Sequence, residues 1–460
     1  MEFGIDAIDY YLPKLALQIS SLAEKRNIVP AKLEKGLGLK YMALPDVNED
    51  TASMAANALL KLIENNNIDP HSIGRIYLGT ESAVDAAKPT ATYAVGTVEK
   101  ILSSKYGERC FKYCDVVDLT FACIGAVDAL ENCLNWVKVH PKKKAIVIAS
   151  DVAKYGLESS GEYTQGAGAV AMLVTSNPNL ISINETIGIS MEHVSDFFKP
   201  REEIDNEYLK KSKTTVQELT NSNKEKIELY SEEPVFDGQY SNECYQNRIR
   251  EALDHFKSET NINFLKEWNH LIFHLPYAYQ GRRMMLDIWI EWIKENGDLV
   301  KLENEIGKLD EINYKDWKKA ASKSNSYKIF IDQKIKDGEM ASSYIGNMYT
   351  ASIFMSLISL LFCANDKKNK ISGNTIGFLS YGSGSKSKIF QGKIKDNWEH
   401  KIEHLKVMED IQSREIISFN TYENLHNRSL KSPLIKQNNI VLESLDEREN
   451  KIGFRYYNKA

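Results

Sequence analysis

The sequence predicts an α/β protein built from two similar halves. Apolar runs typical of buried strands alternate with longer segments in which apolar residues recur at helical spacing. One order of elements, an apolar strand that ends in a polar residue and a later helix that begins with another, occurs in residues 1–175 and again in residues 176–460. A chain of 460 residues can bury one large core or two ordinary ones. We therefore expect two halves that share one topology.

The first half contains strands and helices in alternation. A short N-terminal strand precedes predicted helices at residues 15–25 and 52–64. The apolar run 73–79 is a predicted strand that leads into Glu81. Residues 145–151 form a fully apolar strand of the kind found inside parallel sheets. After a loop rich in small residues, the last predicted strand of this half follows.

The second half repeats this order with different polar residues. Residues 271–274 form an apolar run that ends in His274. Asn347 opens an apolar helix that continues to residue 361. A strand at residues 375–380 then leads into a loop of glycine and serine residues. The two halves therefore place polar residues at matching positions.

Three more segments complete the second half. Residues 291–336 are rich in lysine and glutamate and are predicted to form surface helices added to the repeated unit. Residues 195–233 carry many charges and little apolar periodicity, so we expect exposed helices and loops that form a cap. The tail, residues 396–460, contains short strands and an amphipathic helix, and we expect it to fold back onto the second half.

The composition argues against nucleic acid, membrane and secretion. Lysine and arginine number 58 against 63 aspartates and glutamates, and this net charge of −5 offers no basic surface to a polyanion. The longest apolar run, residues 351–364, is shorter than the about 20 residues that span a bilayer, and the N-terminus does not resemble a secretory signal. The six cysteines show no paired spacing. We expect a cytoplasmic protein with reduced thiols and no metal.

Cys123 is the candidate nucleophile. It lies where a strand-like run at residues 117–121 gives way to a helix. A sulfur in the first turn of a helix faces unpaired N–H groups and the positive end of the helix dipole. We therefore expect the thiolate to form more readily than the free-solution pKa of about 8.5 suggests. The alternative is a small cysteine that only fills a gap in the core.

Glu81 and His274 end strands at corresponding positions of the two halves, and Asn347 begins a helix as Cys123 does. A solvated strand end is the alternative explanation for Glu81, and a core histidine bonded to backbone is the alternative for His274. Together, however, a thiol, a carboxylate and an imidazole supply what a carbon–carbon bond-forming thioester enzyme needs. The thiol carries an acyl group, the carboxylate moves a proton, and the imidazole polarises a carbonyl. We expect these residues to converge at one site.

The chain resembles the 3-hydroxy-3-methylglutaryl-CoA synthases, condensing enzymes of the thiolase superfamily, over nearly its whole length. The motifs that carry the resemblance stand in the family's order. They are Thr80-Glu81-Ser82, Ala122-Cys123, the strand 149–155 that ends in Tyr155, the loop 164–169 that begins with Thr164, the block 193–200 with Phe197, Phe236-Asp237-Gly238, Phe273-His274-Leu275-Pro276, Gly346-Asn347, and the loop 380–385 with Gly382 and Ser383.

The resemblance implies a thiolase-like layered αβαβα fold, with helices between two sheets, and a homodimer. It implies an acyltransferase of the mevalonate pathway of isoprenoid biosynthesis that condenses acetyl-CoA with acetoacetyl-CoA and water to give 3-hydroxy-3-methylglutaryl-CoA and CoA. Cys123 would carry the acetyl group, Glu81 would move the proton, and His274 would bind the ketone. The CoA thioesters are substrates, so no cofactor is implied. The implied substrate-binding residues are Tyr155, Thr164, Phe197, Asn347, Gly382, Ser383, Arg282 and Arg283.

Three residues depart from the family pattern. Ile124 replaces a usual tyrosine and Tyr163 a usual proline, and we expect both to touch walls of the pocket. Tyr279 stands where members carry a lysine, so Arg282 and Arg283 are expected to contact CoA phosphates in its place. A relative from a polyketide pathway, which condenses acyl groups on a carrier protein, is the alternative function. A scaffold that has lost its activity is a weaker one, since every reacting residue is present.

Overall fold

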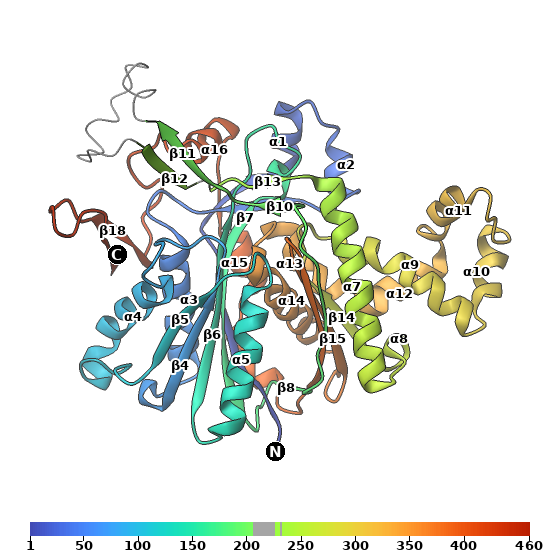
Figure 1. The fold of residues 1–460 in the computed structure, drawn as a ribbon, viewed down its shortest axis with the longest axis horizontal. Coiled ribbons are helices and arrows are strands. Elements are labelled where there is room, and N and C mark those ends of the chain that lie inside the picture. Colours follow the sequence, from blue (N-terminus) through green and yellow to red (C-terminus); the bar gives the residue numbers. More distant parts are fainter. Residues whose placement is uncertain (206–225, 231) are drawn as a thin grey trace.

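The first half forms a five-stranded sheet in the computed structural model, which describes residues 1–205, 226–230 and 232–460 (Figure 1). The strand order is β1-β7-β6-β4-β5, in which β4 pairs in parallel with β5 and β6, and the other neighbours are antiparallel. The predicted strand at residues 145–151 is thus parallel to one neighbour only. The strands are β1 (Phe3–Tyr11), β4 (Ile73–Gly79), β5 (Asp115–Leu119), β6 (Lys144–Ala153) and β7 (Gly166–Ser176).

The second half adds strands to the same sheet. Its strand order is β14-β15-β16, and β9 pairs with residues 386–389 at the start of β16. The short strand β8 pairs with β1 on one side and with β16 on the other, so the sheets of the two halves join into a single ten-stranded sheet. The resemblance implied two sheets, and β8 makes them continuous. The strands are β8 (Ile181–Ile183), β9 (Gly188–Met191), β14 (His270–Phe273), β15 (Thr375–Gly382) and β16 (Lys386–Ile394).

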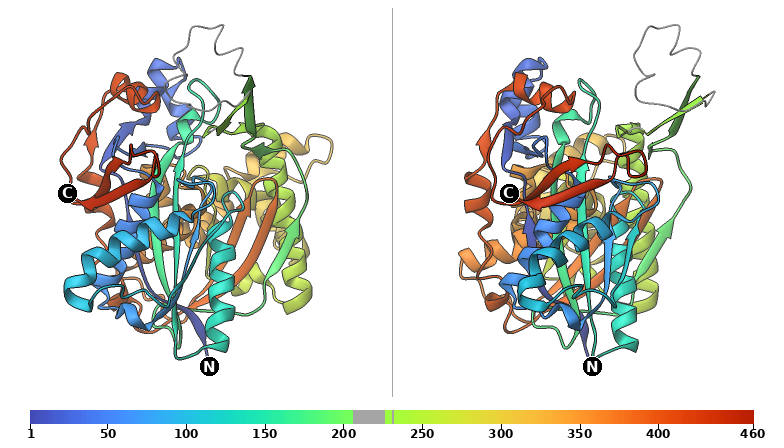
Figure 2. Two further views of the ribbon diagram at one scale, coloured as in Figure 1. Left: turned by 60° about the vertical axis from the view of Figure 1, so that its left-hand side comes forward. Right: turned by 90° about the vertical axis from the view of Figure 1, so that its left-hand side faces the viewer.

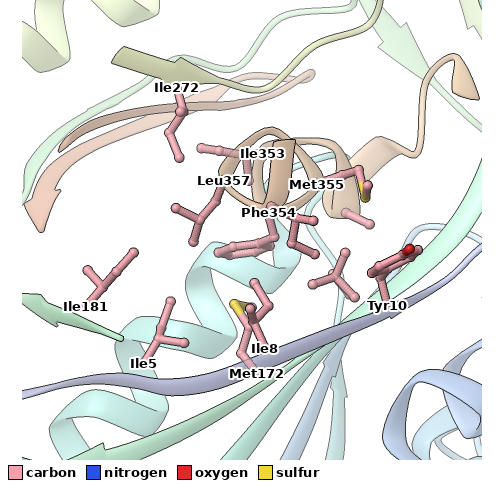
Figure 3. Close-up of a cluster of buried hydrophobic side chains, with 14 of the residues drawn as sticks. Ile5, Ile8, Tyr10, Met172, Ile181, Ile272, Ile353, Phe354, Met355 and Leu357 are labelled. Carbon is pink, nitrogen blue, oxygen red and sulfur yellow. The ribbon is translucent and has the colours of Figure 1, made fainter. Parts of the chain in front are cut away.

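Helices fill three layers around the two halves of the sheet. The central layer packs between them, where Ile5 of β1 and Met172 of β7 meet Phe354 and Leu357 of the middle helix α14, with Ile272 of β14 beyond (Figure 3). Separate apolar clusters hold the outer helices against each half. The αβαβα fold class is confirmed. The helices are α3 (Thr51–Asn65) and α4 (Thr90–Tyr106) outside the first half, α5 (Gly125–Val139), α13 (Lys336–Ile345) and α14 (Ser352–Asp366) in the centre, and α7 (Gly238–Thr260) and α9 (Gln280–Glu295) outside the second half.

The helix α14 is a core helix, as predicted. With the turn before it, Tyr349–Asp366 is long and apolar enough to cross a membrane by length and composition, yet 78% of this stretch is buried inside the fold. An apolar helix that is covered on all sides is what the centre of a large layered protein requires. The burial of α14 in the protein core therefore accounts for its apolar composition without a membrane.

The inserted helices lie at one side of the second half. Among them, α10 and α11 project away from the body (Figure 1). Trp317 and Leu302 form their small interior, and the predicted surface helices between residues 291 and 336 are confirmed. The helices are α8 (Phe264–Glu267), α10 (Leu299–Ile306), α11 (Tyr314–Ala321) and α12 (Asn325–Lys334).

Two local predictions are wrong. The predicted helix at residues 15–25 begins as β2 (Leu15–Gln18), which pairs with β3 (Tyr41–Leu44), and only α1 (Ile19–Lys25) is helical. The predicted cap at residues 195–233 contains strands rather than helices where the structure describes it; residues 206–225 and 231 lie outside the described part. These strands pair locally as β10 (Phe197–Phe198) with β13 (Val235–Phe236), and β11 (Arg201–Asp205) with β12 (Lys226–Tyr230).

The predicted packing of the tail on the second half is right only for its first part. Residues 396–414 pack in the central layer, where Arg414 donates to the carbonyl of Tyr344 in α13, and the rest of the tail packs on the first half. Its strand β17 (Glu415–Ile416) pairs with β2, and its hairpin of β18 (Ile440–Leu445) and β19 (Arg455–Lys459) lies across α3 and α4 (Figure 2). Polar groups of the first half hold the hairpin. The side-chain amide of Asn57 donates to the carbonyl of Ile440 at 2.8 Å, and the Tyr457 hydroxyl donates to Asp50 at 2.8 Å. The tail also contains α15 (Val407–Gln412) and α16 (Phe419–His426).

Candidate active site

Cys123 lies in a strained turn between β5 and α5. The preceding residue, Ala122, has φ +38°, a backbone angle that residues other than glycine rarely adopt. Backbone strain of this kind is concentrated at functional sites. The helix begins at Gly125, so Cys123 lies just before the helix instead of in its first turn. The first-turn N–H of Ala126 is already bonded to the Thr350 hydroxyl at 2.8 Å. That donor is therefore not available to stabilise a thiolate.

The thiol of Cys123 contacts the carboxyl group of Glu81. Sγ donates to Oε2 over 3.5 Å, and both residues are buried. Burial, followed by the negative charges of Glu81 and Asp151, raises the pKa of the thiol well above its ordinary value. The prediction of a lowered thiol pKa is wrong, because desolvation and two carboxylates outweigh the helix dipole. The sulfur must lose its proton as it attacks, and Glu81 is the base in contact with it.

Glu81 follows the end of β4 and faces a lysine. Nζ of Lys199 lies 3.3 Å from Oε1 and donates to the Glu81 carbonyl at 3.3 Å. Burial raises the pKa of Glu81 to about 7, although the charge of Lys199 opposes the shift. A carboxyl group with this pKa can take up and release a proton near neutral pH, which general acid–base catalysis requires.

The buried carboxylate of Asp151 holds Glu81 in place. It accepts hydrogen bonds from the hydroxyl groups of Thr80 at 2.8 Å and Ser82 at 2.6 Å, and from the Glu81 N–H at 2.9 Å. It also accepts from the N–H of Thr350, in the second half, at 3.1 Å. With four donors, this carboxylate fixes the strand end that carries Glu81 against the helix start of the other half.

The thiol faces a cavity of about 500 Å³, which we call the front cavity. It brings together most of the predicted site residues from both halves. The predicted residues that line it are Cys123, Tyr155, Thr164, Phe197, His274, Asn347, Ser383 and Arg283.

His274 contributes a neutral imidazole to this cavity. Burial lowers the pKa of His274 to about 3, so the ring is uncharged at neutral pH. The Tyr245 hydroxyl donates to its backbone carbonyl at 2.6 Å and fixes the end of β14. A hydrogen bond between the ring and the backbone of Tyr349 opposes the lowering of the pKa but does not cancel it. His274 therefore lines the cavity with an uncharged ring that can donate one hydrogen bond.

Asn347 ties its helix start to the first half. Its N–H donates to the carbonyl of Thr164 at 2.9 Å, and its side-chain oxygen accepts from the N–H of Tyr349 at 2.8 Å. Aromatic rings build the neighbouring wall, where Tyr155 meets Phe236 with ring centroids 5.0 Å apart and Phe197 at 6.5 Å. The wall is apolar, and amide and hydroxyl groups interrupt it at few points, which is typical of a small-molecule site.

The Gly382–Ser383 loop packs directly against the cysteine turn. A Cβ on Gly382 would lie 2.7 Å from Ile124 and 2.8 Å from the carbonyl of Phe121, so only glycine fits there. Asp196 holds this loop by accepting from the Gly384 N–H at 2.7 Å and the Tyr381 hydroxyl at 2.9 Å. Ile124 is buried beneath the loop and is not among the residues that line the front cavity, whereas Tyr163 is, as predicted.

The two candidate phosphate-binding arginines have different surroundings. Arg282 forms a bidentate ion pair with buried Glu339 and stacks on the Tyr279 ring, with 3.7 Å to its centroid. It is not among the residues that line the front cavity. Arg283 lines the cavity and donates to the carbonyl of Gly36 at 2.9 Å. The guanidinium of Arg282 already pairs with a buried carboxylate, so Arg283 is the better placed of the two, and a contact of Arg282 with CoA stays a prediction.

Asp151, Lys199 and Asp196 belong to the site without having been predicted from the sequence. Each carries a charge within a motif that predicts a role for another residue. Asp151 ends an otherwise apolar strand, and a charged residue in a buried run predicts a bound partner. Nothing in the sequence pattern indicates that Lys199 reaches Glu81, because more than a hundred residues separate them.

A buried cysteine at a strand-to-helix turn, in contact with a carboxyl group and facing a histidine from the other half of an αβαβα fold, defines a thiolase-fold acyltransferase. Family models of the N-terminal and C-terminal parts of hydroxymethylglutaryl-coenzyme A synthase match residues 1–179 and 224–448. The chain belongs to the hydroxymethylglutaryl-CoA synthase family.

Similar proteins extend over nearly the whole chain. The hydroxymethylglutaryl-CoA synthase of Haloferax volcanii is 30% identical over 437 residues, which cover 92% of this chain and 91% of that protein. The one of Enterococcus faecalis is 28% identical and covers 94% of each. A relative from Gallus gallus described as cytoplasmic is 28% identical over 85% of this chain and 72% of its own length.

Solved structures match over the full length. The structure of MvaS in complex with 3-hydroxy-3-methylglutaryl coenzyme A has a TM-score of 0.77 at 25% identity and covers 100% of this chain and 99% of that one. The HMG synthase of the curacin biosynthetic pathway has a TM-score of 0.76 at 19% identity and covers 100% of both chains, a likeness of fold alone.

Proposed function

We propose that the enzyme condenses acetyl-CoA with acetoacetyl-CoA and water to give 3-hydroxy-3-methylglutaryl-CoA and CoA, a step of the mevalonate pathway of isoprenoid biosynthesis. The observation that carries this proposal is the contact between Cys123 and Glu81 beside a cavity that His274 and Asn347 line from the other half. A covalent carrier, a base and a carbonyl-binding group lie within one site. Family membership supports the choice of substrates.

The first step transfers an acetyl group to Cys123. Sγ attacks the thioester carbonyl of acetyl-CoA as its proton moves to Oε2 of Glu81, and CoA leaves with a proton. Backbone N–H groups of the cysteine turn and the Gly382–Ser383 loop are the candidate donors to the developing oxyanion. The tight packing of this loop on Ile124 keeps such donors in fixed positions.

The second step forms the carbon–carbon bond. Glu81 removes a proton from the acetyl methyl group, and the resulting enolate adds to the C3 carbonyl of acetoacetyl-CoA. The C3 alkoxide then takes up the proton from Glu81 and becomes the hydroxyl group, which returns Glu81 to the carboxylate. Because the His274 ring is neutral, it can donate one hydrogen bond to that carbonyl, but it does not place a positive charge beside the carbonyl oxygen. Asn347 and the aromatic wall around Tyr155 and Phe197 would hold the acyl chain.

Other features of the proposal concern the whole molecule. We propose a cytoplasmic homodimer that binds neither nucleic acid nor membrane and uses no cofactor or metal. The strand β5 lies at an end of the strand order and is partly exposed, and such an edge is available to a second copy. The Gallus gallus relative supports the location. The proposed steps are thioester exchange, proton transfer, addition of an enolate to a carbonyl and thioester hydrolysis, and none of them needs an oxidant or a reductant.

The test is turnover by the purified full-length chain. With both CoA thioesters present, we expect the enolate absorbance of acetoacetyl-CoA to disappear, one CoA to be released per turnover, and mass spectrometry to detect 3-hydroxy-3-methylglutaryl-CoA. The parallel reaction contains an acetoacetyl group on an acyl carrier protein. Turnover of the carrier-bound substrate alone would reject the proposal in favour of the polyketide-pathway alternative, and no turnover of either would favour an inactive scaffold.

A further inference from the structure

A second cavity lies behind Glu81. We call it the rear cavity; its volume is about 970 Å³, and Glu81, Ser82 and Lys199 are among its lining residues. Among the described residues, its lining shares no member with that of the front cavity. Yet Glu81 lines one cavity and Cys123 the other, and their side chains are 3.5 Å apart. This pair therefore lies between the two cavities.

Charged side chains stand among the apolar ones that line the rear cavity, which leads from the surface to the catalytic pair. Arg428 on its wall has a side chain that is 72% exposed, whereas the Glu81 side chain is 5% exposed. Carboxyl groups of Asp46 and Asp50 and the ammonium group of Lys154 line the space between. A roomy cavity with several charged partners holds water, unlike an apolar one, which stays dry.

The proposed reaction needs water at a moment when the front cavity is occupied. After condensation, the product is held at both ends: one end is a thioester of Cys123, and the other is the CoA thioester in the front cavity. The pantetheine arm and acyl chain then fill the space that His274 and Asn347 line. Water must still reach the Cys123 thioester to release the product.

We propose that the rear cavity supplies the water that hydrolyses the enzyme-bound product. This inference rests on the proposed function. Water enters past Lys199, gives a proton to Glu81 and adds its oxygen to the thioester carbonyl. The carbon–sulfur bond breaks, the sulfur of Cys123 takes the proton, and the new carboxylic acid leaves as part of 3-hydroxy-3-methylglutaryl-CoA. The thioester and one water thus become one acid and one thiol.

If water enters through the rear cavity, the two thioesters that form on Cys123, the acetyl group and the condensed adduct, should differ in how water reaches them. Once CoA has left, acetyl-Cys123 has an empty front cavity, so water can reach it from either side. The condensed adduct has only the rear side. Filling the rear cavity with a larger side chain should therefore slow loss of the adduct by about tenfold or more, but change loss of the acetyl group by less than about twofold.

Two filling variants on different walls test this prediction. Ala83→Phe and Val47→Trp each enlarge a residue that lines the rear cavity. Ala86→Phe is the matched control, since Ala86 is exposed in the same loop as Ala83 and is not among the lining residues. Rapid quenching and intact-protein mass spectrometry follow both thioesters on Cys123. Unchanged hydrolysis of the adduct, or equal slowing of both thioesters, would overturn the proposal.

A wild-type experiment keeps the proposal testable if both filled variants fail to fold. Acetyl-Cys123 is formed, freed of CoA and mixed with saturating desulfo-CoA, which occupies the front cavity without reacting. We expect hydrolysis to continue at about half its rate or faster, and collapse of the rate would show that water enters through the front. If wild type forms adduct and product while these tests fail, only the water route is wrong; if it forms neither, the proposed function fails as well.

Discussion

The two halves place their polar residues at matching strand ends and helix starts. Burial nevertheless shifts the pKa of the residue from the first half upward and the pKa of the residue from the second half downward. In the first half, the thiol of Cys123 donates to the carboxyl of Glu81, and Glu81 lies beside two charged groups, Asp151 from the same half and Lys199 from the second. Burial raises the pKa of Glu81 to about 7. In the second half, burial lowers the pKa of His274 to about 3 and leaves it neutral.

This difference shows how one topology supports two tasks. A buried carboxyl group with a pKa near the working pH can exchange protons, and the charged neighbours tune it. A buried neutral imidazole can only orient and polarise a carbonyl through a hydrogen bond. The first half is therefore suited to covalent and proton transfer, and the second half to binding the ketone. Each substitution below removes one part of this division.

Replacement of Cys123 by serine should have the largest effect. We expect kcat to fall by about 10⁴-fold or more, because the acetyl carrier is lost. Incubation with acetyl-CoA, digestion and mass spectrometry should locate the acetyl group on Cys123 in wild type and nowhere in the variant. Cys114→Ser is the control, since Cys114 is partly exposed outside the cavity and should leave the label intact. A label on Cys133 or Cys244 would remove Cys123 from its role.

Glu81→Ala should separate the two half-reactions. Condensation should fall by about 10²- to 10⁴-fold, because the base for the acetyl methyl group is gone. Acetylation should be slower, because the base in contact with Sγ is lost, but it should remain detectable, because loss of the negative charge of Glu81 also lowers the pKa of the Cys123 thiol. Stopped-flow acetylation and steady-state condensation measure the two effects, with exposed Glu232→Gln of the rear cavity as the control. Condensation at the wild-type rate would show that another group is the base.

His274→Ala should affect one substrate selectively. A lost hydrogen bond to the ketone costs about 1–3 kcal/mol in binding and more in the transition state. The KM for acetoacetyl-CoA should rise and kcat should fall, while the burst of acetylation stays intact. His270→Ala, at the start of the same strand, is the matched control. A loss of acetylation by several hundredfold, measured without acetoacetyl-CoA, would instead make His274 the base for Cys123.

Lys199→Met should have the smallest effect, visible in the pH profile. The positive charge of Lys199 lowers the pKa of Glu81, so its removal raises that pKa further above about 7. Condensation needs the carboxylate, so the acid limb of kcat should move to higher pH, and activity should recover as the pH rises. Lys154→Met is the control, since Lys154 pairs with exposed Glu232 in the same cavity. An acid limb that stays in place would mean that Glu81 does not set it.

Element types and the convergence of the site could be predicted from the sequence because they depend on local pattern. Strand ends at Glu81 and His274 follow from apolar runs and place polar groups at one edge of a sheet. The thiol pKa of Cys123 could not be predicted in this way. Its direction depends on Glu81 and Asp151, which approach the sulfur only in the folded chain.

Contacts between residues far apart in the chain could not be predicted from the sequence either. The tail has the apolar pattern of strands, but the pattern does not say which surface it covers. The hairpin is held on the first half by the apolar packing of Ile440 and Tyr457 and by polar contacts such as that of Asn57 with Ile440, all between residues far apart in the chain. The ion pair of Arg282 could not be predicted for the same reason, because its partner Glu339 lies on another helix. Charge alone could not distinguish it from Arg283.

The hairpin of the tail has a consequence for the order of events during synthesis. Asp50 receives Arg455 and Tyr457 as partners from about 400 residues later in the chain. At typical rates of translation, that distance corresponds to a delay of roughly 20 to 80 seconds. The first half thus leaves the ribosome with the outer surface of α3 and α4 uncovered. The hairpin of β18 and β19 can cover this surface only after its own residues have been made.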